Sequence, residues 1–540
     1  MPVSIHRRDQ LILLVLGIIF FAITLPGISW GTPSIWHPDE QVKVADRALR
    51  GLTIIDTRNF DYPSLAKYTM YWLGRVVYGL GYARADFIQA ARLVSVLLGS
   101  LIVVLTYAIA RQSGSRAPSA VFAACLVISS SEMALNARFA HVDIYLVFFA
   151  CLSVLLLLKY RSTRKLIWLY GSFITVGLTA SSKYNGLSLV VAVILVYIIT
   201  EKNQIAENKR RFIRPLIIGL VLTFFGFVFG TPRMLLSMSF YVPKVALALL
   251  HHATYDIEAG DQIGLLGQWR VLISAHGVVE VIFFLASAIW AIGKVGRFLT
   301  AHTQADEGKA DQIGVILLSL LALNLPILIS YNYPERFFLP FLPLLSVLGG
   351  IFIQDLFYLA KRTSYKSLGV VVIAMALAIL VLSFLRVASV DLLFLNDNRI
   401  DASKYLETLP IGASIEYSLY PPNLPERRLN KFNYPIFFQK FPEAEPPQGK
   451  AYKFNQGEPG IEKRRPDYFV IDSFTYLRFD DPVVCAELAN ECAFFKRLLA
   501  GETNYQLMQA FDYQLPDFLP HLQPKFLNPI ILVYQRRPGT

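Results

Sequence analysis

Long apolar runs separated by short charged segments dominate the chain up to about residue 390. A helix needs about 20 residues, at 1.5 Å each, to cross the hydrocarbon layer of a bilayer. Leu11 to Ser29 is the first run of this length, and the later runs each close at charge or at Pro and Gly. The pattern predicts about eleven spanning helices, at 11–29, 87–110, 118–135, 142–158, 166–182, 186–200, 215–231, 271–293, 312–330, 337–358 and 367–389.

Basic residues predict the orientation of these helices, because short cytoplasmic loops are rich in Lys and Arg. With the amino terminus inside and the carboxy terminus outside, every predicted inner segment contains at least two Lys or Arg. We therefore attribute the net charge of +12 to topology and to attraction for anionic membrane lipids, with no nucleic-acid partner. The inner segments are 6–8, 111–116, 159–165, 201–214, 294–311 and 361–366.

Composition agrees with a membrane protein, since 54% of residues are hydrophobic and 17% are charged, against about 25% charged in soluble domains. The predicted fold class is a polytopic α-helical membrane protein with a small carboxy-terminal α/β domain outside the cytoplasm. We assign residues 1–395 to a transmembrane catalytic domain with outer loops 30–86 and 234–270, and residues 396–540 to the extracytoplasmic domain.

The carboxy-terminal domain begins with a predicted helix at Asp401 and continues with strand-like sequence at 412–420, 467–472 and 529–534. Cys485 and Cys492 both lie in it, and outside the cytosol they can form a disulfide.

Acidic residues on the predicted outer face are the first candidates for chemistry. Asp39 and Glu40 follow the first helix, where a carboxylate can act as general base on an acceptor hydroxyl or bind a metal; the alternative is a solvated loop acid. Asp143 lies at the outer end of an apolar span, where ionisable groups are costly and usually functional. Arg138 and His141 share its tip, so a structural pair between Arg138 and Asp143 is the alternative there.

Cations on the same face break the positive-inside bias. Lys183 and Arg336 occupy two further outer tips, and Lys67 lies in the first outer loop. Such an exception indicates a bound anion near the outer leaflet, for example a lipid-linked phosphate, with snorkelling toward headgroups as the alternative. The chain has no Walker loop, no dinucleotide glycine motif and no HExxH, so ATP-driven transport, nicotinamide chemistry and zinc proteolysis lack support.

At these residues the chain resembles the C-type glycosyltransferase superfamily, in particular the protein mannosyltransferase and lipid A aminoarabinose transferase group. The matching segments occur in the family's order, although Tyr62 and Ser64 stand where the family has other residues. They are the Asp39-Glu40 pair, DYPSLAK at 61–67, ARFAHVDIY at 137–145, SKYNG at 182–186 and YPERFFLPFLPLL at 333–345.

The resemblance implies transfer of a sugar from a polyprenyl-phosphate donor to an acceptor hydroxyl, on a protein, lipid or glycan, at the non-cytoplasmic face. It makes Asp39 the catalytic base, with Glu40 and Asp143 in the catalytic set, and it assigns the donor phosphate to Lys67, Lys183 and Arg336. Arg138, which shares the tip of Asp143, is added to the phosphate-binding set. For a divalent metal the candidates are Asp39, His141 and Asp143.

The main alternative is a flippase or transporter of lipid-linked sugars, which also needs many helices and a cationic headgroup site. Transporters place ionisable groups near the bilayer midplane in repeated halves. Here the acids cluster at outer tips and no repeat is visible. The absence of a retention signal favours a bacterial inner membrane.

Overall fold

The computed structural model describes residues 7–55, 60–207, 209–253, 263–301, 307–362, 366–425, 430–431 and 457–539. It divides into two compact units, of which the first comprises 1–28 and 39–390 and the second comprises 29–38 and 391–540. Residues 30–38 of the predicted first outer loop thus belong to the second unit. Parts of outer loop 234–270 and of the carboxy-terminal domain lie outside the described residues.

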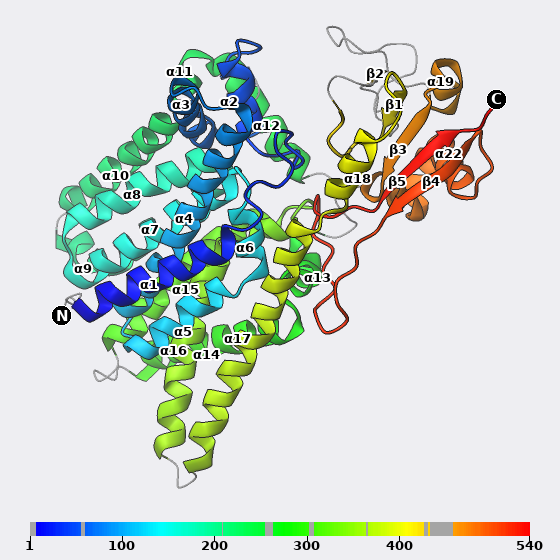
Figure 1. Cartoon of the computed structure of the whole chain (residues 1–540). Helices are drawn as coiled ribbons and strands as arrows, with labels where there is room; N and C mark the ends of the chain where they lie inside the picture. The colour runs from blue at the N-terminus through cyan, green and yellow to red at the C-terminus, as the bar shows by residue number, and fades with distance from the viewer. Residues whose placement is uncertain are drawn as a thin grey trace. The chain divides into compact units, whose positions relative to one another are not determined.

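The first unit is built of helices (Figure 1). In chain order they are α1 (Arg7–Thr24), α2 (Val42–Leu49), α3 (Leu65–Gly79), α4 (Arg84–Gln112), α5 (Ala117–Ile128), α6 (Ser131–Ala137), α7 (Val142–Thr163), α8 (Leu166–Ser182), η1 (Tyr184–Ser188), α9 (Leu189–Glu207), α10 (Lys209–Gly230), α11 (Arg233–Leu236), α12 (Met238–Ala253), α13 (Gly264–His276), α14 (Val278–Ala301), α15 (Glu307–Leu328), η3 (Glu335–Phe338), α16 (Phe341–Arg362) and α17 (Lys366–Leu395).

Eight helices among the described residues are long and apolar enough to cross a membrane, and α5 with α6, bent by 61°, makes a ninth if the pair is one span. Two more predicted spans, at 11–29 and 166–182, coincide with α1 and α8. Of these, α1 begins with three charged residues and α8 is shorter than the spanning helices. A multi-pass helical membrane protein is therefore confirmed, whereas the number of eleven spans and the orientation stay predictions.

Helix α8 packs closely against α10. A Cβ atom at Gly177 would lie 2.2 Å from the carbonyl oxygen of Thr223, and one at Gly226 would lie 2.4 Å from that of Ile174. Without a hydrophobic driving force inside a bilayer, helices associate through such close backbone contacts at small residues. The two glycines thus allow α8 and α10 to pack closely, and Lys183 follows the last residue of α8.

The second unit carries a mixed five-stranded sheet in the order β2-β1-β3-β5-β4. β1 is parallel to β2 and β3, while β5 is antiparallel to β3 and β4. The small sheet confirms the α/β reading of this region. Its elements are α18 (Asn398–Glu407), β1 (Ser414–Tyr417), β2 (Asn430–Lys431), α19 (Gly457–Arg464), β3 (Tyr468–Asp472), α20 (Ser473–Tyr476), η4 (Leu477–Asp480), α21 (Pro482–Glu487), α22 (Ala489–Leu499), β4 (Tyr505–Phe511) and β5 (Ile531–Arg536).

The three predicted strands correspond to β1, β3 and β5, while β4 was not predicted. A disulfide joins Cys485 and Cys492, whose Cα atoms are 5.2 Å apart, so this prediction is confirmed. Apolar side chains of α18, β1, β3 and β5 form the core on which the sheet rests, including Leu406, Ile415, Val470 and Val533.

Candidate active site

A chain of four alternating charges joins three predicted outer tips of the first unit to its first outer loop. Asp39 Oδ2 lies 2.9 Å from Arg336 Nη2, and Arg336 Nε lies 3.8 Å from Asp143 Oδ2. Lys183 Nζ donates to Asp143 Oδ1 at 2.8 Å. Residues far apart in the sequence therefore form one polar cluster, which we call the outer charge cluster.

His141 and Tyr62 extend this cluster toward Lys67. His141 Nδ1 lies 2.7 Å from Asp143 Oδ2, and the His141 ring meets the Tyr62 ring edge-on at 5.4 Å. Lys67 Nζ donates to the carbonyl oxygen of Tyr62 at 2.9 Å. Lys67 is thereby held beside the cluster through the backbone of the residue that packs on His141.

Helix ends explain why these charges are tolerated at buried positions. Asp143 lies in the first turn of α7, and Lys183 is the residue that ends α8. A helix carries partial positive charge at its amino end and partial negative charge at its carboxyl end, so each residue occupies the end that favours its charge. The Lys183 ammonium also lies 3.7 Å from the ring centre of Phe337, an aromatic face that attracts a cation.

Exposure divides the cluster into an inner and an outer half. The side chains of Asp143 and Lys183 are 1% and 8% exposed, whereas those of Arg336 and Asp39 are 20% and 30% exposed. The inner pair can hold a fixed geometry, and the outer pair is accessible to a substrate. Asp39 is thus the more exposed of the two carboxylates of the cluster.

The surroundings shift the pKa values of this site in opposite directions. Burial lowers the pKa of the Lys183 ammonium, although Asp143 opposes the shift. Burial also acts against the charge of Arg336, but the neighbouring Tyr62 and the two carboxylates outweigh it and raise the pKa of the guanidinium. Burial raises the pKa of Tyr62, with the nearby carboxylates adding to the effect, so its phenol stays neutral. Arg336 therefore stays charged at a pH where Lys183 begins to lose its proton.

Glu40 is oriented away from this chemistry by a buried partner. Its two carboxylate oxygens accept hydrogen bonds from Arg92 Nε and Nη2, each at 2.8 Å, and Oε1 also accepts one from the Ala140 N–H at 2.9 Å. The Gln41 N–H donates in turn to the Ala140 carbonyl at 2.8 Å. Glu40 thus fastens the first outer loop to the tip that carries His141.

Arg138 also makes hydrogen bonds to the scaffold. Its guanidinium donates to the carbonyl oxygens of Ile23, Pro26 and Ala134 at 2.8 to 2.9 Å, and the residue is fully buried. These bonds tie the end of α6 to the carboxyl end of α1. Of the predicted site residues, the structure brings together Asp39, Lys67, His141, Asp143, Lys183 and Arg336, whereas Glu40 and Arg138 brace the loops behind them.

The donor set does not suit a divalent metal ion in this arrangement. Asp143 Oδ1 is paired with Lys183, its Oδ2 lies near Arg336 and His141, and Asp39 is paired with Arg336. Within the described part of the chain, His, Cys, Asp and Glu form no group of three or more that could hold a metal. We therefore derive no step through a metal, and metal dependence stays an untested prediction.

Arg92 is the important residue that sequence reasoning missed. It lies inside an apolar span, and an ionisable group there needs a partner. The position of Arg92 inside an apolar span could have identified it as a buried charge in need of a partner. The sequence does not show that the partner is the carboxylate of Glu40.

Comparison with known proteins points to one class. Residues 65–242 match the family model of dolichyl-phosphate-mannose-protein mannosyltransferase, a stretch that contains Lys67, His141, Asp143 and Lys183. No curated protein sequence matches the chain significantly.

Two of the solved structures that match the chain are the following. The chain superposes on ArnT from Cupriavidus metallidurans bound to undecaprenyl phosphate with a TM-score of 0.51 and 14% identity, over 97% of each chain. It superposes on the oligosaccharyltransferase of Archaeoglobus fulgidus with a TM-score of 0.51 and 12% identity, over 86% of this chain and 69% of that one. The chain therefore shares its fold with ArnT and with this oligosaccharyltransferase. The resemblance to the protein mannosyltransferase and aminoarabinose transferase group is confirmed.

Proposed function

We propose that the protein is a membrane glycosyltransferase that transfers a sugar from a polyprenyl-phosphate donor to an acceptor hydroxyl on the non-cytoplasmic face. The observation that carries this proposal is the outer charge cluster, in which a partly exposed carboxylate lies beside Arg336 and, through Asp143, beside Lys183. The name of the ArnT structure, which reports bound undecaprenyl phosphate, supports this kind of donor.

In the proposed reaction, the acceptor oxygen forms a bond to the anomeric carbon of the donor sugar while the bond from that carbon to the phosphate oxygen breaks. Asp39 takes the hydroxyl proton as general base. The bonding electrons leave with the polyprenyl phosphate, whose growing negative charge is stabilised by Lys67, Lys183 and Arg336. A phosphate leaving group needs such cations more than it needs a proton.

Arg336 links the two halves of the reaction. It contacts Asp39 on one side and lies near Asp143 on the other, so a phosphate bound by Arg336 would lie next to the base. Holding the leaving group and the base at one guanidinium aligns acceptor and donor, which is a large part of catalysis in two-substrate reactions. Asp143 and His141 act as positioning residues in this scheme, because they hold Lys183 and the Tyr62 segment.

We place the protein in a bacterial inner membrane with its active site on the periplasmic side. This placement extends the predicted orientation, in which the amino terminus is inside and the outer tips carry the cluster. The sugar and the acceptor depend on the ligands that the site accepts, and a donor panel addresses them directly.

The decisive experiment measures sugar transfer by purified protein from a panel of radiolabelled polyprenyl-phosphate sugars, beside Asp39→Asn. Transfer by the wild type that is lost in a monodisperse Asp39→Asn protein would support both the activity and the base. Undiminished transfer would remove Asp39 from the mechanism. If the wild type consumes no donor but moves lipid-linked sugar across reconstituted vesicles, the flippase alternative replaces the enzyme.

A further inference from the structure

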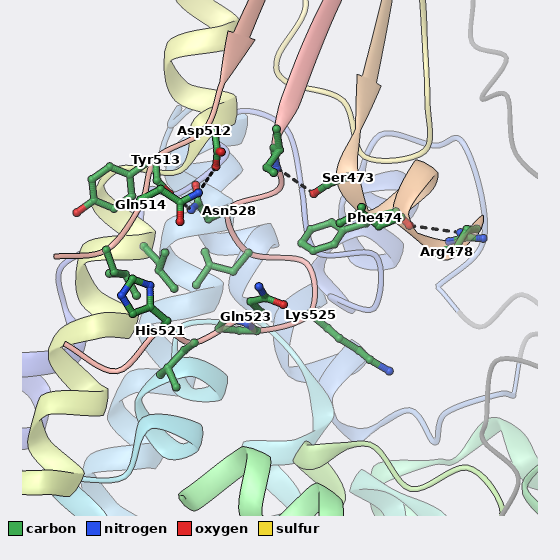
Figure 2. Close-up of a pocket in the computed structure, with 17 residues that line it drawn as sticks. Ser473, Phe474, Arg478, Asp512, Tyr513, Gln514, His521, Gln523, Lys525 and Asn528 are labelled. Atoms are coloured by element: carbon green, nitrogen blue, oxygen red, sulfur yellow. Dashed lines mark hydrogen bonds between the residues drawn. The ribbon is translucent and has the colours of Figure 1, made fainter. Parts of the chain in front are cut away.

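A cavity of about 450 Å³ lies entirely within the second unit, beside the edge of its sheet (Figure 2). Because β1, β3 and β4 run in the same direction and β5 runs opposite to them, the carboxyl ends of β1, β3 and β4 lie at the end of the sheet where β5 begins. The cavity is lined by residues 473–478, which directly follow β3, and by residues from the 512–530 segment between β4 and β5. Its volume is typical of small-molecule sites, and the carboxyl edge of parallel strands is where α/β sheets usually bind ligands.

The wall formed by residues 512–530 is a long connection without helix or strand. Loops longer than about 12 to 15 residues in a compact domain are usually functional. This one is fastened at both ends by Asn398, whose Oδ1 accepts from the Tyr513 N–H at 2.6 Å and whose Nδ2 donates to the Pro529 carbonyl at 3.1 Å. The segment therefore has a defined shape before any ligand binds.

A buried ion pair completes this anchoring. Asp397 and Arg399 are both fully buried and lie 2.7 Å apart. Asp397 Oδ2 also accepts the Asn528 N–H at 2.8 Å, and Arg399 donates to the Phe526 carbonyl at 2.8 Å. Burying charged groups carries a free-energy cost, which these hydrogen bonds offset. The network holds the backbone of the 512–530 segment, which forms a wall of the cavity, in one conformation.

Two cationic residues, Arg478 and Lys525, are among those that line the cavity, and Arg478 Nε also donates to the Phe474 carbonyl at 3.3 Å. In Figure 2, Arg478 and Lys525 lie on one side of the view, while Asp512 and Gln514, joined by a hydrogen bond of 2.5 Å, lie on the other. Lys525 makes no hydrogen bond or ion pair with any described residue. An ammonium and a guanidinium at one end of a cavity favour an anionic group such as phosphate or carboxylate.

The rest of the lining favours a hydroxylated ring. Phe474 extends its ring toward the middle of the cavity, and Gln523 and His521 lie across from it (Figure 2). Gln523 and His521 make no side-chain hydrogen bond within the described ranges, so both can donate and accept toward a ligand. An aromatic face packs against the C–H face of a sugar, while amides and imidazoles bind its hydroxyls.

We propose that this cavity binds an anionic saccharide, a sugar that carries a phosphate or a carboxylate. The cationic side takes the charged group, Phe474 takes the ring, and Gln523 and His521 take hydroxyls. The site is formed by one unit and does not depend on the transfer reaction, so it can be tested with no donor present.

The test uses the full-length protein in detergent and three probes: glucose 6-phosphate, glucose and inorganic phosphate. Binding is located by hydrogen exchange of the 512–530 backbone and quantified by calorimetry. The variant is the double substitution Arg478→Gln with Lys525→Gln, and the matched control is Lys404→Gln, an exposed cation of the same unit on α18. Far-ultraviolet circular dichroism and monodispersity establish that the variants are folded.

We expect glucose 6-phosphate to slow exchange in 512–530 and to bind at least tenfold more tightly than either glucose or phosphate. The double variant should lose this protection and weaken binding at least tenfold, while Lys404→Gln matches the wild type. Three results would overturn the proposal: no protection of 512–530 by any probe, equal protection by phosphate alone, or protection that persists in the folded double variant. Because no donor is present, these results are independent of whether the protein transfers sugar.

Discussion

Two neighbouring acids in the first outer loop have opposite environments. Glu40 is fully buried and is matched by one equally buried arginine, Arg92, that binds both of its oxygens. Asp39 is 30% exposed, and its arginine is shared with Asp143, which also binds Lys183 and His141. Each pair consists of a carboxylate and a guanidinium. Only the Asp39–Arg336 pair is exposed enough for a ligand to replace one partner.

The difference shows how to separate structural charge from reactive charge. A buried pair with all its hydrogen bonds made is costly to break and gains nothing from a ligand. In the outer charge cluster, two cations face two carboxylates, and the side chains of Arg336 and Asp39 are 20% and 30% exposed, so a phosphate can approach Arg336 from outside. From this comparison we expect Glu40 to act in stability and Asp39 in chemistry, and the following experiments test that expectation.

The largest effect is expected for Asp39→Asn, which removes the base and keeps the shape. Loss of general base catalysis typically costs about 10²- to 10⁴-fold in rate. We expect kcat for sugar transfer to fall within this range with the melting temperature unchanged, because the side chain is partly exposed. Asp61→Asn, at an exposed acid of the same loop, is the matched control. A similar loss in that control would mean that loop charge, and not the base, was removed.

Glu40→Ala should show the converse pattern. Removing one partner of a buried ion pair costs about 3–5 kcal/mol, because it leaves Arg92 uncompensated. We expect a clear fall in thermal stability in detergent, with transfer per folded molecule within a few fold of the wild type. The double variant Glu40→Leu with Arg92→Met should recover much of the stability. If Glu40→Ala is stable and inactive, Glu40 belongs to the chemistry after all.

Arg336→Gln should cost less than loss of the base. One electrostatic contact to a developing negative charge is worth about 10²- to 10³-fold in rate. We expect kcat/KM for the donor to fall by about 10²-fold, with kcat lowered as well as KM raised, because the charge on the phosphate grows in the transition state. A change in KM alone would make Arg336 a binding residue only.

The smallest effect is expected from pH. Burial lowers the pKa of Lys183 from its usual 10.5, while that of Arg336 is raised, so Lys183 is the first of the two to lose its charge as the pH rises. Donor affinity should fall at a pH below 10.5, by about tenfold for one lost charge contact. Because arginine keeps its charge to higher pH, Lys183→Arg should keep the donor affinity constant to a higher pH. If the fall in donor affinity occurs at the same pH in Lys183→Arg as in the wild type, Lys183 is not its cause.

The residues of the outer charge cluster could be predicted from the sequence better than the buried residues that hold the surrounding loops in place. Apolar run length and Lys-Arg bias predicted Asp143, Lys183 and Arg336 at tips on one face, because those features depend on the bilayer alone, and the structure brings the three side chains together. Which tips meet depends on helix packing, which periodicity does not encode, so Arg92 was not matched to Glu40. The strand β4 was missed because most of its residues are exposed and it is an edge strand, so it lacks the buried alternation that marks a strand.

The anchoring of the 512–530 segment restricts protein engineering of this domain. Its shape is set by Asp397, Asn398 and Arg399, which lie more than a hundred residues earlier in the chain. A graft of the segment onto a related scaffold should therefore carry these three residues with it. Conversely, a scaffold that already provides these three residues can receive segments with different side chains at the cavity. The three residues would then hold each new segment in the same backbone position.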